Sequence, residues 1–228
     1  MLPGKEIMTT RVLKKANTRR SLINAALQLS AERGFSGLSL REIARQAGIA
    51  PTTFYRHFHD MDDLGLALVD EVALSLRSLM RQARQRTRES GSVVKASVDA
   101  FMQFIRENSN HFRLLLGERS GSSSSFRKAI HGEMDHFIGE LAEDLTRLSL
   151  ASGRSLSDAG LTAEAIVAVV FTVGAEALDL PLQDRKWLAE RLVGEIRIIL
   201  RGSELLGKPV SQHGLKEKLA IGLSRKAI

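Results

Sequence analysis

Cysteine is absent from this 228-residue chain, and aromatic residues are scarce, with one Trp, one Tyr and nine Phe. The lack of cysteine excludes disulfide bonds, thiolate nucleophiles and cysteine-ligated zinc, and it fits a reducing compartment. No segment has the pattern of a secretory signal peptide, and the longest uncharged apolar run, residues 165–175, is shorter than the roughly 20 residues that span a membrane. We therefore expect a cytoplasmic protein that does not enter a membrane.

Catalytic and cofactor motifs are missing as well. The sequence contains no G-x-S-x-G, H-E-x-x-H, P-loop or G-x-G-x-x-G pattern, and the serine run at 122–125 has the composition of a flexible loop. His131, Asp135 and His136 stand on adjacent helical turns, with His111 nearby in the chain, but such side chains more commonly hydrate a helix surface or make contacts between subunits. We predict no enzyme activity, no metal site and no cofactor.

Strand signals are also absent, which leaves helical periodicity as the dominant pattern. Apolar residues recur every three or four positions along most of the chain, and no alternating pattern or hairpin turn interrupts them. Hydrophobic residues make up 43% of the sequence, enough to bury a core. The sequence therefore predicts an all-α fold, with helices over residues 14–33, 39–47, from 51 onward, 61–87, 92–107, 111–119, 126–149, 162–178 and 184–205.

Positive charge is concentrated at one end of the chain. Residues 1–60 hold 10 Lys and Arg against 4 Asp and Glu, whereas the remaining residues hold 23 against 22. A basic segment on a nearly neutral body indicates one module that binds a polyanion. We predict a polyanion-binding module with a basic arm at 1–60, a helical domain with another task at 61–206, and a flexible tail at 207–228.

Two short helices joined by a tight turn are predicted within the basic segment. Ser39 and Glu42 have the spacing of a capping box, which starts a helix. Gly48 is suited to end that helix, and Pro51 is suited to the first position of the next one. The pattern is typical of a helix-turn-helix, whose second helix enters the major groove of DNA.

The run G-F-S-G-L-S-L-R-E-I-A-R-Q-A-G-I-A-P-T-T-F-Y-R-H-F at residues 34–58 resembles the DNA-binding domain of TetR-family transcriptional regulators. This resemblance, strong over residues 14–70, implies a homodimeric repressor that binds a palindromic operator in double-stranded DNA. It also implies that residues 1–60 form the DNA-binding domain and residues 61–206 the effector-binding and dimerisation domain. The segments L-S-A-E-R-x-F and H-F-R-L-L-L-G-E-R-S-G are similar to the FabR branch of that family, the repressors of unsaturated fatty acid synthesis. The second resemblance implies long-chain acyl-CoA or acyl-carrier protein as the effector.

Two alternatives stay open at this stage. One is a TetR-type repressor that responds to another apolar small molecule, and the other is a helical lipid-binding protein or enzyme with a basic appendage. The chain also departs from the family pattern at Ala50, Thr52 and Met61, where the family commonly has a capping Ser, a Gly and a phosphate-binding Lys. We expect the basic arm to compensate for the missing lysine.

The DNA contacts are expected from polar and basic side chains of the arm and the helix-turn-helix. Hydroxyls and cations suit phosphate oxygens, and threonine methyls suit thymine methyls, while Phe54 and Phe58 should face the core. A half-buried core position is the alternative for Tyr55. The expected contacts are Lys14, Lys15, Arg19, Ser39, Arg41, Pro51, Thr52, Thr53, Tyr55, Arg56 and His57.

Large apolar side chains in the body are candidates for an effector pocket, because an acyl chain needs a long apolar slot. The expected lining residues are Leu74, Met80, Phe101, Phe104, Ile105, Phe112, Leu116, Phe137, Val170 and Phe171, although ordinary core packing explains any one of them. The arginines that could meet the phosphates of CoA, or simply form solvated helix faces, are Arg77, Arg81, Arg84, Arg113 and Arg119.

The last two predicted helices carry more apolar positions than the surface of a monomer should expose. We therefore expect them to pair with their copies across a two-fold axis as a four-helix bundle. The expected interface residues are Ile166, Val169, Val173, Leu188, Leu192, Ile196 and Ile199.

Overall fold

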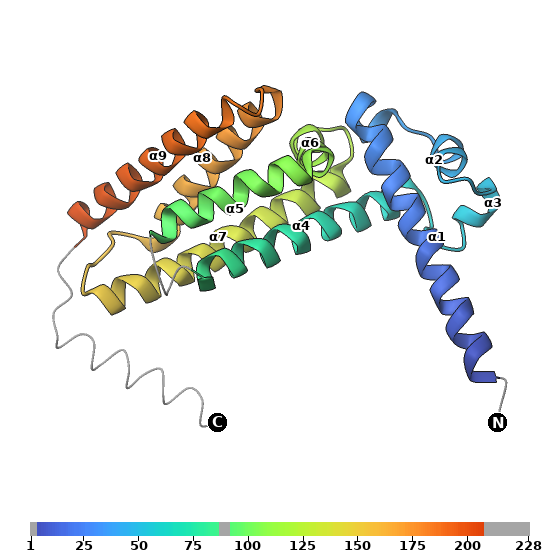
Figure 1. Cartoon of the computed structure of the whole chain (residues 1–228), viewed down its shortest axis with the longest axis horizontal. Coiled ribbons are helices and arrows are strands. Elements are labelled where there is room, and N and C mark those ends of the chain that lie inside the picture. Colours follow the sequence, from blue (N-terminus) through green and yellow to red (C-terminus); the bar gives the residue numbers. More distant parts are fainter. Residues whose placement is uncertain (1–3, 87–91, 208–228) are drawn as a thin grey trace. The chain divides into compact units, whose positions relative to one another are not determined.

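Helices make up all the regular structure in the computed structural model, which describes residues 4–86 and 92–207, with side chains from 12 to 80 and from 92 to 207 (Figure 1). This confirms the predicted all-α fold. Most of the predicted tail lies outside the described residues. The elements are α1 (Gly4–Arg33), the 3₁₀ turn η1 (Phe35–Gly37), α2 (Leu40–Gln46), α3 (Pro51–Phe54), α4 (Met61–Arg86), α5 (Val93–Glu107), α6 (Ser109–Glu118), α7 (Ser124–Ser152), α8 (Ala159–Asp179) and α9 (Arg185–Leu206).

The first helix begins much earlier than the sequence predicted. It starts at Gly4 rather than at Lys14, while α6 and α7 each start two residues before their predicted first residues. The prediction used apolar periodicity, which locates a helix only where one face is buried. The side chains of residues 12–17 are exposed, so this part of α1 has no apolar face to reveal it.

The chain forms two compact units, which we describe separately. Unit 1 comprises Met1–Glu133 and Gly174–Pro181, and unit 2 comprises Met134–Val173 and Leu182–Ile228, so the boundaries fall inside α7 and α8. No boundary lies near residue 60, because α1 packs on both α4 and α6 within unit 1. The division into a DNA-binding and an effector domain therefore stays a prediction about function.

The core of the helix-turn-helix is built from side chains of α1, α2 and α3. Leu22 and Ile23 of α1, Ile43 of α2, Phe54 of α3 and Phe58 are all buried, and α2 packs on both α1 and α3. Burial of each such side chain stabilises the fold by about 1.5–3 kcal/mol. Phe54 and Phe58 therefore face the core as predicted, which turns the intervening residues of this segment outward.

A close approach of backbone to ring joins α7 to α4 in unit 1. A Cβ atom at Gly65 of α4 would lie 1.8 Å from the ring of Phe126, so only glycine lets that ring rest against the helix. The ring centre of Phe126 also lies 4.9 Å from that of Phe35 in η1. Phe126 therefore connects the start of α7 both to α4 and to the turn before α2.

In unit 2, a buried hydrogen bond holds α8 against α9. The hydroxyls of Thr162 and Ser203 are 2.7 Å apart, and the backbone N–H of Ser157 donates to the carbonyl of Ser203 at 3.0 Å.

Among the described residues, α8 alone is long and apolar enough to cross a membrane by length and composition. The helix is longer than the uncharged apolar run at residues 165–175, which by itself is too short for a membrane span. Half of its most apolar stretch is buried, and core helices of globular proteins have the same composition.

Candidate nucleic-acid interface

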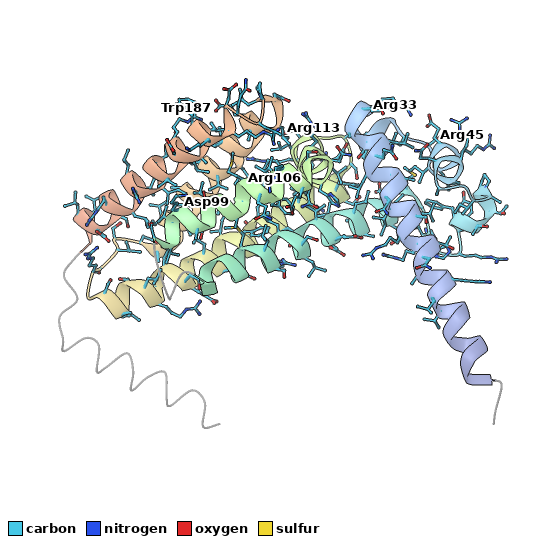
Figure 2. All side chains as sticks on the ribbon, viewed as in Figure 1. Arg33, Arg45, Asp99, Arg106, Arg113 and Trp187 are labelled. Atoms are coloured by element: carbon cyan, nitrogen blue, oxygen red, sulfur yellow. The ribbon has the colours of Figure 1, made fainter. Side chains whose placement is uncertain are left out.

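The second helix begins with the capping box that the sequence predicted. The backbone N–H of Glu42 donates to the Ser39 hydroxyl at 3.3 Å, and the Glu42 carboxylate accepts from the Ser39 backbone N–H at 3.0 Å. Arg33 lies at the end of α1 (Figure 2) and pairs with Glu42 at 3.2 Å. These hydrogen bonds, led by those from Ser39, lower the pKa of the Glu42 carboxyl. The start of α2 is thereby fixed to α1.

The predicted turn and third helix are also present. Gly48 has φ of +69°, the left-handed conformation expected after α2, and Pro51 occupies the first turn of α3. No side chain caps α3 at Ala50, as the departure from the family pattern implied. The helix itself covers only Pro51–Phe54, because a turn follows at Tyr55.

The outer face of α3 and the turn after it is polar and open. Tyr55 is 65% exposed, which rules out the alternative of a half-buried core position, and its ring meets that of Phe54 edge-on at 5.8 Å. The remaining expected contacts of this segment are likewise accessible: Pro51, Thr52 and Arg56 are exposed, and Thr53 and His57 are half-buried. Ser39 and Arg41 at the start of α2 are exposed as well.

The basic arm is a helical continuation of α1 rather than an extended strand. Lys14, Lys15 and Arg19 are exposed, and the Arg19 guanidinium lies over the Phe58 ring at 4.9 Å. Arg20 reaches Glu71 of α4 at 4.0 Å. Stacking on Phe58 holds Arg19 beside the segment that carries the recognition residues.

Basic residues of α1 and of the recognition segment, residues 51–58, lie close enough to His57 to affect its ionisation. Burial first, and then the charges of Lys15, Arg19 and Arg56, lower the pKa of His57 below its ordinary value. Its Nδ1 atom is buried and has no hydrogen-bond partner among the described residues. Three cations around a half-buried imidazole form an electropositive cluster suited to a phosphate group.

The start of α4 has the opposite charge. Asp60 accepts from the backbone N–H of Asp63 at 2.8 Å, and this bond and one from His59 lower the pKa of the Asp60 carboxyl. Asp62 and Asp63 follow in the first turn, and Met61 is half-buried. Because three carboxylates would repel phosphate, this end of α4 cannot replace the phosphate contact that a lysine at position 61 would make.

Both parts of the chain match known protein families. Residues 22–68 match the bacterial regulatory proteins of the tetR family, and residues 90–199 match the tetracyclin repressor-like C-terminal domain. The chain belongs to the TetR family of transcriptional regulators. Members of this family bind DNA, usually as homodimers, and are generally not enzymes.

Solved structures of TetR-type regulators share the fold. A transcriptional regulator from Rhodococcus sp. Rha1 is 19% identical, with a TM-score of 0.67 over 82% of this chain and 97% of its own. A regulator from Syntrophomonas wolfei is 16% identical, with a TM-score of 0.68 over 80% and 94%. The fatty acid degradation regulator FadR from Bacillus halodurans is 20% identical, with a TM-score of 0.64 over 80% and 94%.

The residues expected to line an effector pocket divide between the two units. In unit 1, Phe101, Phe104, Ile105 and Phe112 are buried, whereas Met80 and Leu116 are half-buried. In unit 2, Phe171 is buried, and Phe137 and Val170 are half-buried. Leu74 is 58% exposed on α4, so the expectation that it lines an enclosed pocket is wrong for this conformation.

Two of the arginines considered for CoA phosphates have partners inside unit 1. Arg77 pairs with Glu133 of α7. Arg113 of α6, labelled in Figure 2, donates to the carbonyl of Leu178 at 3.0 Å and pairs with Asp179 at 3.1 Å. Arg119 is exposed, and the side chains of Arg81 and Arg84 lie outside the described residues. The described residues contain no cluster of three His, Cys, Asp or Glu that could hold a metal ion.

Several residues of the predicted dimer face lie in the interior of the single chain, Val173 among them with 2% of its surface exposed. Leu188 and Leu192 are fully buried within the single chain, so they have no surface to offer a partner, and Ile166 and Ile196 are also buried. A groove of about 490 Å³ lies instead between α8 and α9 of unit 2. Its lining consists of Ala168, Val169, Thr172, Val173, Arg191, Glu195, Ile198 and Ile199.

Sequence reasoning missed Ile198, which is 73% exposed beside this groove. Glu118, which is buried at the end of α6, was not predicted as a functional residue either. Ile198 directly precedes the predicted interface residue Ile199 on an amphipathic helix, and this position was the only sequence feature that pointed to it. Periodicity alone does not show which apolar stripe of a helix faces solvent.

Proposed function

We propose that this chain is a transcriptional repressor that binds a palindromic operator as a homodimer and responds to long-chain acyl-CoA or acyl-carrier protein. Membership of the TetR family establishes a DNA-binding regulator. The operator symmetry, the identity of the effector and the controlled genes, those of unsaturated fatty acid synthesis, belong to the proposal. A cytoplasmic location, which is the rule in this family, is expected as well.

The observation that carries the DNA-binding part is the cluster around His57. Lys15 and Arg19 on α1 and Arg56 after α3 together act on one half-buried imidazole, next to the exposed Tyr55. Phosphate contacts position a protein on DNA, and neighbouring polar side chains then read base edges. We expect each of the two copies to read one half-site in this way.

The groove on α8 and α9 supports the homodimer. Its apolar wall includes the half-buried Val169 and Ile199, and Ile198 on the same wall is exposed. An apolar surface of this kind is suited to its own copy across a two-fold axis, where the same residues meet from both sides. The pair of Arg191 and Glu195, 3.3 Å apart, lines the same groove and can give the interface its orientation.

Two observations bear on the effector. The segments similar to the FabR branch, together with the phenylalanine-rich core of unit 1, support an acyl chain, and FadR, one of the proteins that share the fold, is described as a regulator of fatty acid degradation. Arg77 is paired with Glu133, and Arg113 with the carbonyl of Leu178. These contacts within the chain favour the second candidate, an apolar effector without phosphates. That second candidate is a TetR-type repressor with the same operator binding and another apolar signal.

The test starts from an operator selected by the full-length protein from a pool of random duplexes. Operator affinity is then measured by fluorescence anisotropy with CoA alone and with acyl-CoA of ten to eighteen carbons, using a matched detergent as control. An acyl sensor should respond more strongly as the chain lengthens, since each buried methylene contributes about 0.8 kcal/mol, and CoA alone should have no effect. A flat response across these chains would leave a repressor with another apolar effector, and failure to select any operator would refute the proposal.

A further inference from the structure

Glu118 is the only buried acidic side chain among the described residues, with 4% of its surface exposed. It ends α6, and its carboxylate accepts hydrogen bonds from the turn before α2. The backbone N–H groups of Phe35 and Ser36 donate to Oε1 at 3.0 and 3.4 Å, and the Ser36 hydroxyl donates to Oε2 at 3.0 Å. A buried carboxylate with this set of donors is a charge-assisted contact, stronger than one between neutral groups.

Glycines enclose this carboxylate on two sides. Gly34 has φ of +73°, which directs the two successive N–H groups that follow it toward Glu118. On the other side, a Cβ atom at Gly121 would lie 2.4 Å from Oε2 of Glu118, inside the contact distance of real atoms. The space occupied by the carboxylate therefore depends on the absence of a side chain at position 121.

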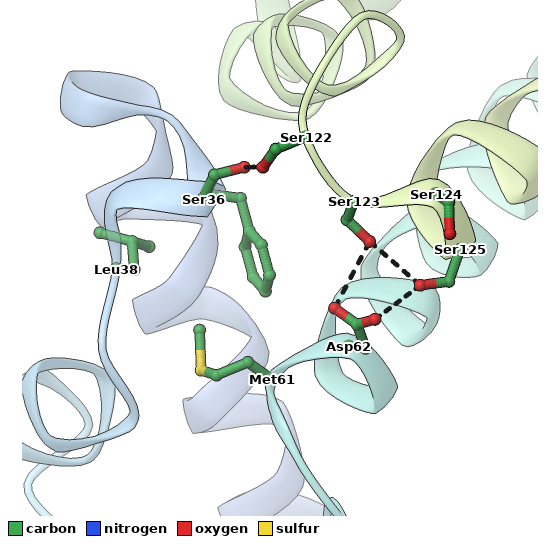
Figure 3. Close-up of a pocket in the computed structure, with 9 residues that line it drawn as sticks. Ser36, Leu38, Met61, Asp62, Ser122, Ser123, Ser124 and Ser125 are labelled. Atoms are coloured by element: carbon green, nitrogen blue, oxygen red, sulfur yellow. Dashed lines mark hydrogen bonds between the residues drawn. The ribbon is translucent and has the colours of Figure 1, made fainter.

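Further contacts surround the same turn. Ser36 and Ser122 have hydroxyl oxygens 3.5 Å apart, and Asp62 at the start of α4 accepts from Ser125 at 2.6 Å (Figure 3). A pocket of about 360 Å³ lies between these two sets of contacts, and Met61 contributes to its lining. The hydroxyl contacts are exposed, whereas those of Glu118 with Phe35 are buried, so Glu118 is the strongest polar connection from α6 to this turn.

We propose that Glu118 is the positioning residue of the DNA-reading segment. The inference rests on the proposed operator binding and adds the residue that holds the reading segment in its orientation. The turn that Glu118 holds ends at Gly37, two residues before the capping residue Ser39. A shift of the turn therefore displaces the start of α2 and, through the packing of α2 on α3, the recognition residues.

The contact has a two-state character. A carboxylate that loses its donors while it stays buried is destabilised by the full cost of an unpaired charge. It therefore either keeps its three hydrogen bonds or leaves the site for water, and intermediate positions are unfavourable. The end of α6 and the reading segment consequently move together or separate completely.

Gly121→Ala tests this directly because it displaces the carboxylate without removing it. The nearest atom to the added methyl is Oε2 at the far end of the Glu118 side chain, whereas the nearest backbone atom, Cα of Glu118, would lie at 3.2 Å, so the carboxylate has to move further than the backbone. Gly117→Ala is the matched control, since it adds the same methyl one position before Glu118, where no atom lies within 4 Å. Glu118→Gln is the second variant, because it retains the shape of the side chain but loses the charge.

The measurements are the affinities of the full-length proteins for the selected operator and for a scrambled duplex of equal length, with amide hydrogen exchange at Phe35 and Ser36. We expect Gly121→Ala and Glu118→Gln to weaken operator binding about tenfold and to leave binding of the scrambled duplex within about twofold, because non-specific affinity depends on charge rather than on orientation. Exchange at the two amides should become faster, and Gly117→Ala should match the parent in every measurement.

Unchanged operator affinity in Gly121→Ala would overturn the inference. An equal loss for both duplexes would also overturn it, because that is the result of a smaller folded fraction. A parent that binds no selected operator would refute the proposed function itself, and the exchange data would then show separately whether Glu118 protects these amides.

Discussion

Operator binding should strengthen as the pH falls, through protonation of His57. In the free protein, burial and the charges of Lys15, Arg19 and Arg56 lower the pKa of this imidazole. Phosphates that bind the three cations offset their charges and supply a partner for the imidazolium. The pKa of His57 is therefore higher in the complex than in the free protein, so binding takes up a proton at each reading segment.

The sign and size follow from linkage. The complex binds more protons than the free protein, so affinity rises as the pH falls through the range around and below the ordinary histidine pKa of about 6.5. Each unit by which DNA raises the pKa corresponds to about 1.4 kcal/mol, or about tenfold in affinity for each reading segment. The stability of the free protein changes in the opposite direction, because its unfolded state binds the proton more readily and gains from a low pH.

The assay is operator anisotropy between pH 5.5 and 8 at constant ionic strength, compared between the parent and His57→Gln. The difference between the two curves isolates His57, since other titrating groups contribute to both. His59→Gln is the control, because His59 is exposed and pairs with Asp60 at 3.1 Å, outside the cationic cluster. If His57→Gln shows the pH dependence of the parent, the electrostatic argument for this cluster fails.

Three further substitutions test the reading segment, its core and the dimer. Tyr55→Ala should weaken operator binding by about 1–3 kcal/mol without lowering the melting temperature, because the side chain is 65% exposed; a large drop in melting temperature would instead assign Tyr55 to the core. Phe54→Ala should lower the free energy of unfolding by about 3–5 kcal/mol in a denaturant titration, since it empties a fully buried site, and a loss below about 1 kcal/mol would contradict that packing. Ile198→Asp should give monomers in light scattering and weaker operator binding, whereas Leu148→Asp, at another exposed apolar position of unit 2, should leave a dimer; a dimeric Ile198→Asp would exclude the α8–α9 groove as the interface.

The features that the sequence predicted best are those set by near neighbours in the chain. Ser39 and Glu42 form their capping box across three residues, Gly48 ends its helix through its own backbone freedom, and Pro51 starts the next one. Each of these signals depends on local geometry, so the helix-turn-helix was placed to within a residue or two. The start of α1 is harder to predict, because the side chains of residues 12–17 are all exposed and give no apolar periodicity.

Features that depend on distant parts of the chain were not predictable in the same way. The contact between Glu118 and Phe35 joins residues 83 positions apart, and the sequence around either residue contains no pattern that predicts it. On α9, periodicity identified an apolar helix but not its orientation, so Leu188 was assigned to the surface and Ile198 was overlooked. Which apolar stripe faces inward is decided by tertiary packing, which a single helical pattern does not contain.

The helical arm has a consequence for how closely binding sites can be spaced on DNA. Among the described side chains of α1, the first buried one is Leu22, and the part of the helix from Gly4 to that point spans about 27 Å, the length of about eight base pairs. A rod of this length can cover DNA beyond the bases that the reading segment recognises. Two copies of the protein could then not occupy neighbouring sites at the same time, even where the recognised bases do not overlap. A second regulator bound beside the operator would compete with the arm for the same DNA phosphates.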